Sequence, residues 1–100
     1  MDLSTRTVYL VAYDVSDPRR LNRCRQVLLG FGDRVQLSVF RCELTARQMV
    51  DLRRKLVDAI NALEDQVLVA DLGPAEGRGA EALSTMGRAC APPSRGATVV

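Results

Sequence analysis

The sequence contains no histidine and no tryptophan, and it has a single lysine, Lys55. Without histidine, the chain cannot form a Ser-His-Asp triad, a Cys-His pair or a histidine metal site. Any hydrolytic chemistry must therefore use carboxylates, most simply with a hard cation bound to oxygen. The sequence also lacks an apolar run long enough to span a bilayer and an apolar signal region at its start, so we expect a cytoplasmic protein with no membrane partner.

Cysteine is scarce and irregularly spaced. Cys24, Cys42 and Cys90 are odd in number and far apart in the sequence. This pattern favours reduced structural thiols over a disulfide framework or a zinc site. One hundred residues are enough for one domain, which we predict over 1–88, and the small, polar and proline-bearing composition of 89–100 predicts a disordered tail.

Positive charge is concentrated in the middle of the chain, although the net charge is only +2. Between Arg19 and Lys55 there are ten basic and three acidic residues, so this span carries ten minus three, or +7. Arginine in place of lysine has a bland explanation in genomic base composition, but that does not explain the clustering. The cluster indicates a nucleic-acid surface, for which Arg19, Arg20, Arg53 and Arg54 are the candidates.

The hydrophobic pattern predicts strands at about 7–14 and 67–72 and helices after Asp17 and Thr45. Asp17 followed by Pro18 is typical of a helix start, and Thr45 to Gln48 matches a capping box. The second helix is expected to bury a stripe that runs from Met49 to Leu63. Residues 34–44 alternate like extended chain, as one bent strand or two short ones, and 83–86 is a candidate for one further short strand.

This order of elements predicts an α+β, ferredoxin-like βαββαβ sandwich with both helices on one face of an antiparallel sheet. Strand 7–14 is apolar on both faces, yet two helices can cover only one. A large uncovered apolar face is unusual on a monomer, so we expect a homodimer that pairs sheet against sheet about a two-fold axis. The alternative is that the tail folds back over this face.

The first strand ends on a carboxylate, Asp14, which is a poor core residue and a good metal ligand or general base. Tyr13-Asp14-Val15, the arginine-rich helix start, and Arg34-Val35-Gln36 with Ser38-Val39-Phe40 occur in the order seen in one family. Over roughly residues 7–88 the chain resembles the Cas2 family of CRISPR-associated proteins, the small subunit of the spacer-acquisition complex. It departs from the family at Arg41, where many relatives have an acidic or small residue, and at Leu21, where some relatives have an arginine.

The resemblance implies a ferredoxin-like homodimer with a magnesium ion at the strand-end aspartate, here Asp14. It also implies a scaffold for the Cas1 integrase and a metal-dependent endonuclease acting on single-stranded RNA or double-stranded DNA. Positions that match the catalytic set of the family are Tyr13, Asp14, Arg23, Arg34 and Phe40. Two facing copies of Asp14 would repel each other without metal and be neutralised by a cation between them.

Several residues keep a structural alternative. Asp17 is more readily an N-cap than a ligand, and Phe40 suits the core as well as base stacking. Arg23 and Arg34 suit phosphate contact or pairing with Asp33 or Asp17. Tyr13 could donate a hydrogen bond near a metal or pack at the dimer face, and Ser38 is expected to satisfy backbone groups.

Three functions remain open at this point. The first is an architectural protein that binds the DNA or RNA backbone and holds the integrase, which we favour as the biological role. The second is a magnesium-dependent phosphodiesterase that uses Asp14. The third is a toxin-type metal-dependent ribonuclease of similar fold.

Overall fold

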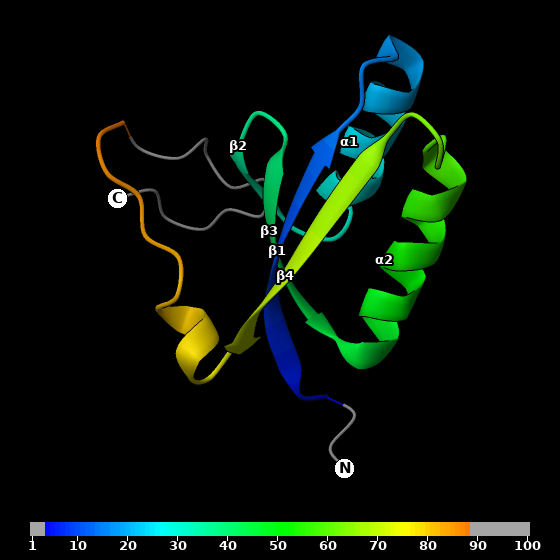
Figure 1. Ribbon diagram of the computed structural model, residues 1–100. Helices are drawn as coiled ribbons and strands as arrows, with labels where there is room; N and C mark the ends of the chain where they lie inside the picture. The colour runs from blue at the N-terminus through cyan, green and yellow to red at the C-terminus, as the bar shows by residue number, and fades with distance from the viewer. Residues whose placement is uncertain (1–3, 89–100) are drawn as a thin grey trace.

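The computed structural model describes residues 4–88, which form a four-stranded antiparallel sheet with two helices on one face (Figure 1). The strand order is β2-β3-β1-β4, so the first and third strands lie in the centre of the sheet. This is the ferredoxin-like arrangement that the sequence predicted. The elements are β1 (Arg6–Asp14), α1 (Pro18–Leu29), β2 (Asp33–Gln36), β3 (Val39–Thr45), α2 (Ala46–Ala59), β4 (Gln66–Pro74) and the short 3-10 helix η1 (Arg78–Ala80).

Both helices begin at the predicted caps. The Asp17 carboxylate accepts a hydrogen bond from the Arg20 N–H at 3.0 Å, and Pro18 occupies the first helical position. At α2, the Thr45 hydroxyl accepts from the Gln48 N–H, while the Gln48 side chain accepts from the Thr45 N–H. These local bonds satisfy N–H groups that have no partner within the helix. The helix starts could therefore be predicted from neighbouring residues alone.

The structure resolves one open point and corrects two predictions. Residues 34–44 form two strands, β2 and β3, joined by a turn at 37–38. The buried stripe of α2 ends with the helix at Ala59, and Leu63, which we expected to continue it, is 96% exposed in the loop before β4. Residues 83–86 form no strand. The predicted tail, 89–100, and Cys90 lie outside the described residues.

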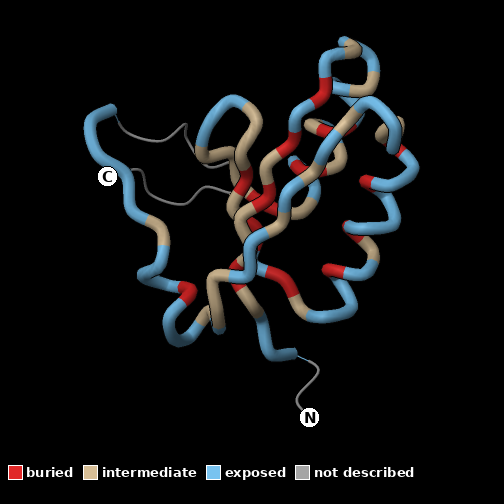
Figure 2. The backbone as a smooth tube through the Cα atoms, in the orientation of Figure 1, coloured by how far each residue is buried: buried red, intermediate tan, exposed pale blue. Residues whose placement is uncertain are grey.

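The core lies between the sheet and the helices, and its buried positions, red in Figure 2, are mainly on β1, β3, α1 and α2. Alternation along β1 sends Tyr9, Val11 and Tyr13 to this side. Cys24 and Cys42 are buried here and neither forms a disulfide, as the cysteine spacing predicted. The core residues that other elements contribute are Leu28 from α1, Phe40 and Leu44 from β3, and Met49, Leu52 and Leu56 from α2.

The opposite face of the sheet, which we call the open face, carries the alternate residues of the same strands. Val8 is fully buried there, because η1 lies so close that a Cβ added to Gly79 would be 2.8 Å from a Val8 methyl. Farther along the strands, Leu10 and Ala12 are half-buried, and their neighbour Leu68 is 59% exposed. The helices therefore leave apolar side chains on this face, as the two-sided pattern of β1 predicted.

Candidate nucleic-acid interface

Asp14 is the last residue of β1, and its side chain is exposed. It pairs with Gln66 of β4, and strand alternation places it on the open face with Ala12 and Leu10. The carboxylate therefore lies at the end of the apolar part of that face. Within residues 4–88, no group of three Asp, Glu or Cys side chains is close enough to hold a metal ion.

Tyr13 lies on the other face of the sheet, toward the helices. Its ring packs against Phe40 with the ring centres 6.3 Å apart, and its hydroxyl donates a hydrogen bond to the carbonyl of Leu37 at 3.4 Å. Its backbone N–H donates to the carbonyl of Ser38 at 3.1 Å, which joins the end of β1 to the turn between β2 and β3. Burial raises the pKa of the Tyr13 phenol, and the positive charges of Arg25 and Arg34 oppose that rise. The phenol is therefore neutral at pH 7.

The predicted catalytic residues do not share one face. Asp14 lies on the open face, whereas Tyr13 and Phe40 face the helices, and Arg34 joins them because it pairs with Phe40 in the sheet register. Phe40 is fully buried, so of the two roles considered for it, the structure favours packing. Arg23 is exposed on α1. Asp14 and Tyr13 are the last two residues of β1, so both lie at the same end of the sheet.

Arg20 is held in an ion pair that sequence reasoning did not anticipate. Its guanidinium donates to the Asp65 carboxylate at 2.7 Å and 3.3 Å, and it lies 4.0 Å from Glu64. The Asp65 side chain is fully inaccessible to solvent and also accepts from the Asn61 N–H. The hydrogen bond from Arg20 is the main reason that the pKa of Asp65 is lowered. Arg20 thus ties α1 to the loop before β4, whereas Arg19 beside it is exposed.

The two arginines of α2 that the sequence singled out are both accessible. Arg54 donates to Asp51 at 2.8 Å on the outer surface, where such a pair contributes little to stability. Arg53 is exposed beside a shallow groove of about 210 Å³ that Val57 and Val67 help to line. Together with Arg19, these side chains can reach a polyanion.

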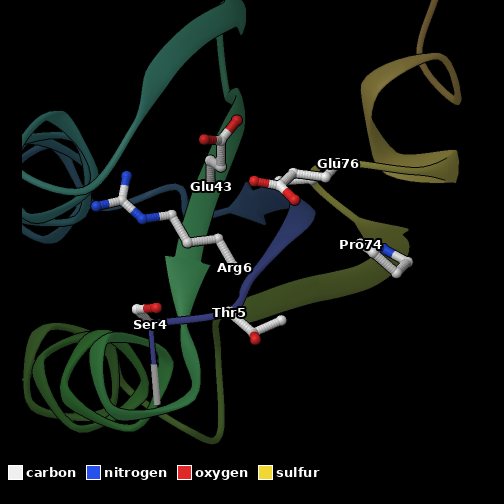
Figure 3. A pocket seen from close by; sticks show the side chains of 7 residues that line it. Ser4, Thr5, Arg6, Glu43, Pro74 and Glu76 are labelled. Carbon is white, nitrogen blue, oxygen red and sulfur yellow. The ribbon is translucent and has the colours of Figure 1, made fainter. Parts of the chain in front are cut away.

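A larger cleft of about 460 Å³ lies at the other end of β1, away from Asp14. Glu43, Glu76 and Arg6 are among the residues that line it, and Figure 3 shows the Arg6 side chain extending away from Glu76. Two carboxylates against one guanidinium make this cleft a poor place for a phosphate. The nucleic-acid candidates therefore lie at the Asp14 end of the sheet and along the helices.

One charged residue near Tyr13 was missed by sequence reasoning. Arg25 of α1 is half-buried and close enough to the phenol to lower its pKa by charge. The available signal was helical spacing, because Arg25 shares a side of the helix with Leu21 and Leu28.

The fold and these residues define a ferredoxin-like α+β protein with a strand-end aspartate on an uncovered sheet face and a basic helical surface. The family model described as "CRISPR associated protein Cas2" matches residues 7–77. The chain belongs to this Cas2 family. Among the described residues, no helix is long and apolar enough to cross a membrane.

Several relatives agree with this assignment. The chain is 41% identical over 69 residues to "CRISPR-associated endoribonuclease Cas2" of Geobacter sulfurreducens, covering 69% of this chain and 73% of that protein. It is 47% identical over 70 residues to a protein of the same name from Thermus thermophilus, covering 69% and 74%. The crystal structure of Streptococcus pyogenes Cas2 superposes with a TM-score of 0.69 at 30% identity, over 80% of this chain and 99% of that one. A hypothetical protein from Thermus thermophilus gives a TM-score of 0.71 at 31% identity, over 89% and 99%.

Proposed function

We propose that this protein is a homodimeric, nucleic-acid-binding subunit of CRISPR spacer acquisition that holds the Cas1 integrase on DNA. The observation that carries the proposal is the apolar face of the sheet that the helices leave uncovered, with Leu68 59% exposed and Leu10 and Ala12 half-buried on it. The family membership supports the CRISPR context. The accessible arginines Arg19, Arg53 and Arg54 supply contacts to the phosphate backbone, which dominate affinity without reading sequence.

The open face is the surface through which two copies pair. Leu10, Ala12 and Leu68 present apolar surface there, and burying it against a second copy would remove it from water. Among the described residues, β4 pairs with β1 alone, so its outer edge offers free N–H and C=O groups. Residues 81–88 follow η1 without regular structure and could add to the β4 edge of the partner.

Magnesium fits this arrangement. Mg²⁺ commonly binds through one or two carboxylates, keeps several waters and uses substrate phosphates as further ligands. A two-fold pairing of open faces would bring two copies of Asp14 together and provide that number. When bound, the ion would supply charge stabilisation and an activated water at a phosphodiester.

A second candidate function is a metal-dependent endonuclease. It is favoured by the exposed carboxylate at the end of β1 and by the name endoribonuclease that the relatives carry. The two functions differ in what they require of Asp14. The scaffold needs the arginines and the dimer, whereas the nuclease also needs the carboxylate as a ligand.

The test compares Asp14→Asn with Asp17→Asn, because asparagine also caps a helix well and the control removes the same charge three residues away. We expect both variants to retain duplex DNA binding, Cas1 association and spacer acquisition in cells. Cleavage of RNA or DNA, if the wild-type protein cleaves either with Mg²⁺, should be lost only in Asp14→Asn.

Two results would decide against the proposal. Loss of acquisition in Asp14→Asn alone would give the carboxylate a role beyond the scaffold. The proposed homodimer would be contradicted if the wild-type protein sedimented as a monomer at micromolar concentration and Leu68→Glu sedimented in the same way.

A further inference from the structure

The residues of the open face lie in rows that cross the sheet, because neighbouring strands are paired residue by residue. Moving away from Asp14, three successive rows across β3, β1 and β4 are Val39, Ala12 and Leu68; Arg41, Leu10 and Ala70; and Glu43, Val8 and Gly73. Apart from Arg41, the side chains of the first two rows are apolar. Leu68 is 59% exposed, Ala70 is exposed, and Leu10 is half-buried. Accessible apolar surface therefore begins beside Asp14 and extends over two rows.

The third row is covered by η1. Val8 is fully buried, although it alternates with the half-buried Leu10 along the same face of β1. The cover fits closely at Gly79, where an added Cβ would lie 2.8 Å from a Val8 methyl and 2.8 Å from the Pro74 carbonyl oxygen. Both distances are too short for a real Cβ, so a larger residue would have to move η1 off the sheet. In Figure 1, η1, drawn in yellow, and α2 lie on opposite sides of the sheet.

The position of η1 limits where a second sheet can pack. Two sheets that pack face to face lie about 10 Å apart. Because η1 packs directly on Val8, it occupies the space that a second sheet would need above the third row. The first two rows can be buried by a second copy without moving η1.

We propose that η1 is a steric stop that confines a second copy of this chain to the first two rows of the open face, next to Asp14. The inference rests on the proposed function, because it needs the homodimer. A two-fold interface uses the same patch on both copies, and an apolar patch is complementary to itself. The first row adjoins Asp14, so the second copy contributes surface beside this carboxylate. Gly79 has a positioning role, because it lets η1 lie flat on the sheet.

The experiment maps the surface that the second copy covers by the labelling rate of single cysteines. The full chain carries Cys90→Ser, so that its remaining native cysteines are the buried Cys24 and Cys42. Leu68→Cys reports on the first row and Glu43→Cys on the third, and both positions are exposed in one copy. Each variant reacts with a water-soluble maleimide at nanomolar and at micromolar protein concentration, with a phosphine present to prevent disulfides.

We expect Leu68→Cys to react roughly tenfold more slowly at the higher concentration, because labelling then follows the small population of free copies. Glu43→Cys should react at the same rate at both concentrations. Slower labelling of Glu43→Cys at the higher concentration would overturn the inference, since the second copy would then reach the third row, while the homodimer would stand. An unchanged rate for Leu68→Cys would instead refute the homodimer of the proposed function on this face.

The role of η1 itself is tested by adding Gly79→Ala to Glu43→Cys, with Gly77→Ala as the matched control. A Cβ added at Gly77 would have its nearest contact at 3.7 Å, so this variant should behave like the parent. We expect Gly79→Ala to make the labelling of Glu43→Cys slower at the higher concentration, because η1 no longer blocks the third row. If Gly79→Ala protein with a wild-type circular dichroism spectrum leaves that rate unchanged, η1 is not the stop.

Discussion

Substitution of Phe40 distinguishes the two roles considered for this residue, which are packing in the core and stacking on a base. Phe40 is fully buried in β3, and its ring packs against Tyr13 within the core. Truncation of a buried phenylalanine to alanine costs about 3–5 kcal/mol, a large share of the 5–15 kcal/mol that stabilises a typical domain. Phe40→Leu retains most of the apolar volume and should cost about 1–1.5 kcal/mol. For a domain of this size, that cost lowers the melting temperature by about 4–12 °C.

The assay pairs thermal unfolding, followed by circular dichroism at a fixed protein concentration, with affinity for single-stranded RNA at a temperature where the variant is folded. If Phe40 only packs, Phe40→Leu melts earlier and binds like wild type. Leu52→Ala, at a fully buried position of α2, is the control for destabilisation alone. Stacking of a base on an aromatic ring contributes about 1–3 kcal/mol. A Phe40→Leu variant with the wild-type melting temperature and at least fivefold weaker binding would refute our reasoning.

Two further predictions concern the fold that supports the site. Asp65 has a lowered pKa in the folded protein, so its ion pair with Arg20 stabilises the fold above the ordinary aspartate pKa of about 4, and this contribution is lost as the pH falls toward the lowered value. Urea unfolding should therefore show Asp65→Asn less stable than wild type at pH 7 and a smaller difference at pH 3; a constant difference would contradict this account. A Cβ added at Gly32 would lie 2.3 Å from the Arg41 carbonyl oxygen, so Gly32→Ala should cost at least about 1–3 kcal/mol in thermal unfolding. Gly30→Ala, whose nearest contact would be 3.3 Å, is the matched control and should change stability much less.

The sequence predicted those parts of the fold that depend on neighbouring residues. Asp17 with Pro18 and Thr45 with Gln48 act within one helical turn, so their chemistry can be identified without knowing the tertiary structure. The alternation of β1 likewise indicated that both faces of the strand are apolar. From these features the sandwich and the uncovered sheet face followed directly.

The parts that were missed depend on contacts between distant segments. Arg20 was expected on a nucleic-acid surface, but its partner Asp65 lies 45 positions later, and no local pattern joins them. Arg25 is half-buried and Arg23 is exposed, although both lie on α1, and this difference depends on how the helix packs on the sheet. Leu63 has the spacing of the apolar stripe of α2, but the helix ends at Ala59, so Leu63 is exposed.

Thr45 is at once the last residue of β3 and the cap of α2, so no linker separates the strand from the helix. A connection of zero length has no hinge. The sheet therefore fixes the direction in which α2 leaves it. The distance between the arginines of α2 and the Asp14 end of β1 is fixed in the same way. A polyanion that contacts both the α2 arginines and the Asp14 end of β1 must therefore adapt its own shape, because no flexible linker between β3 and α2 lets the protein adapt.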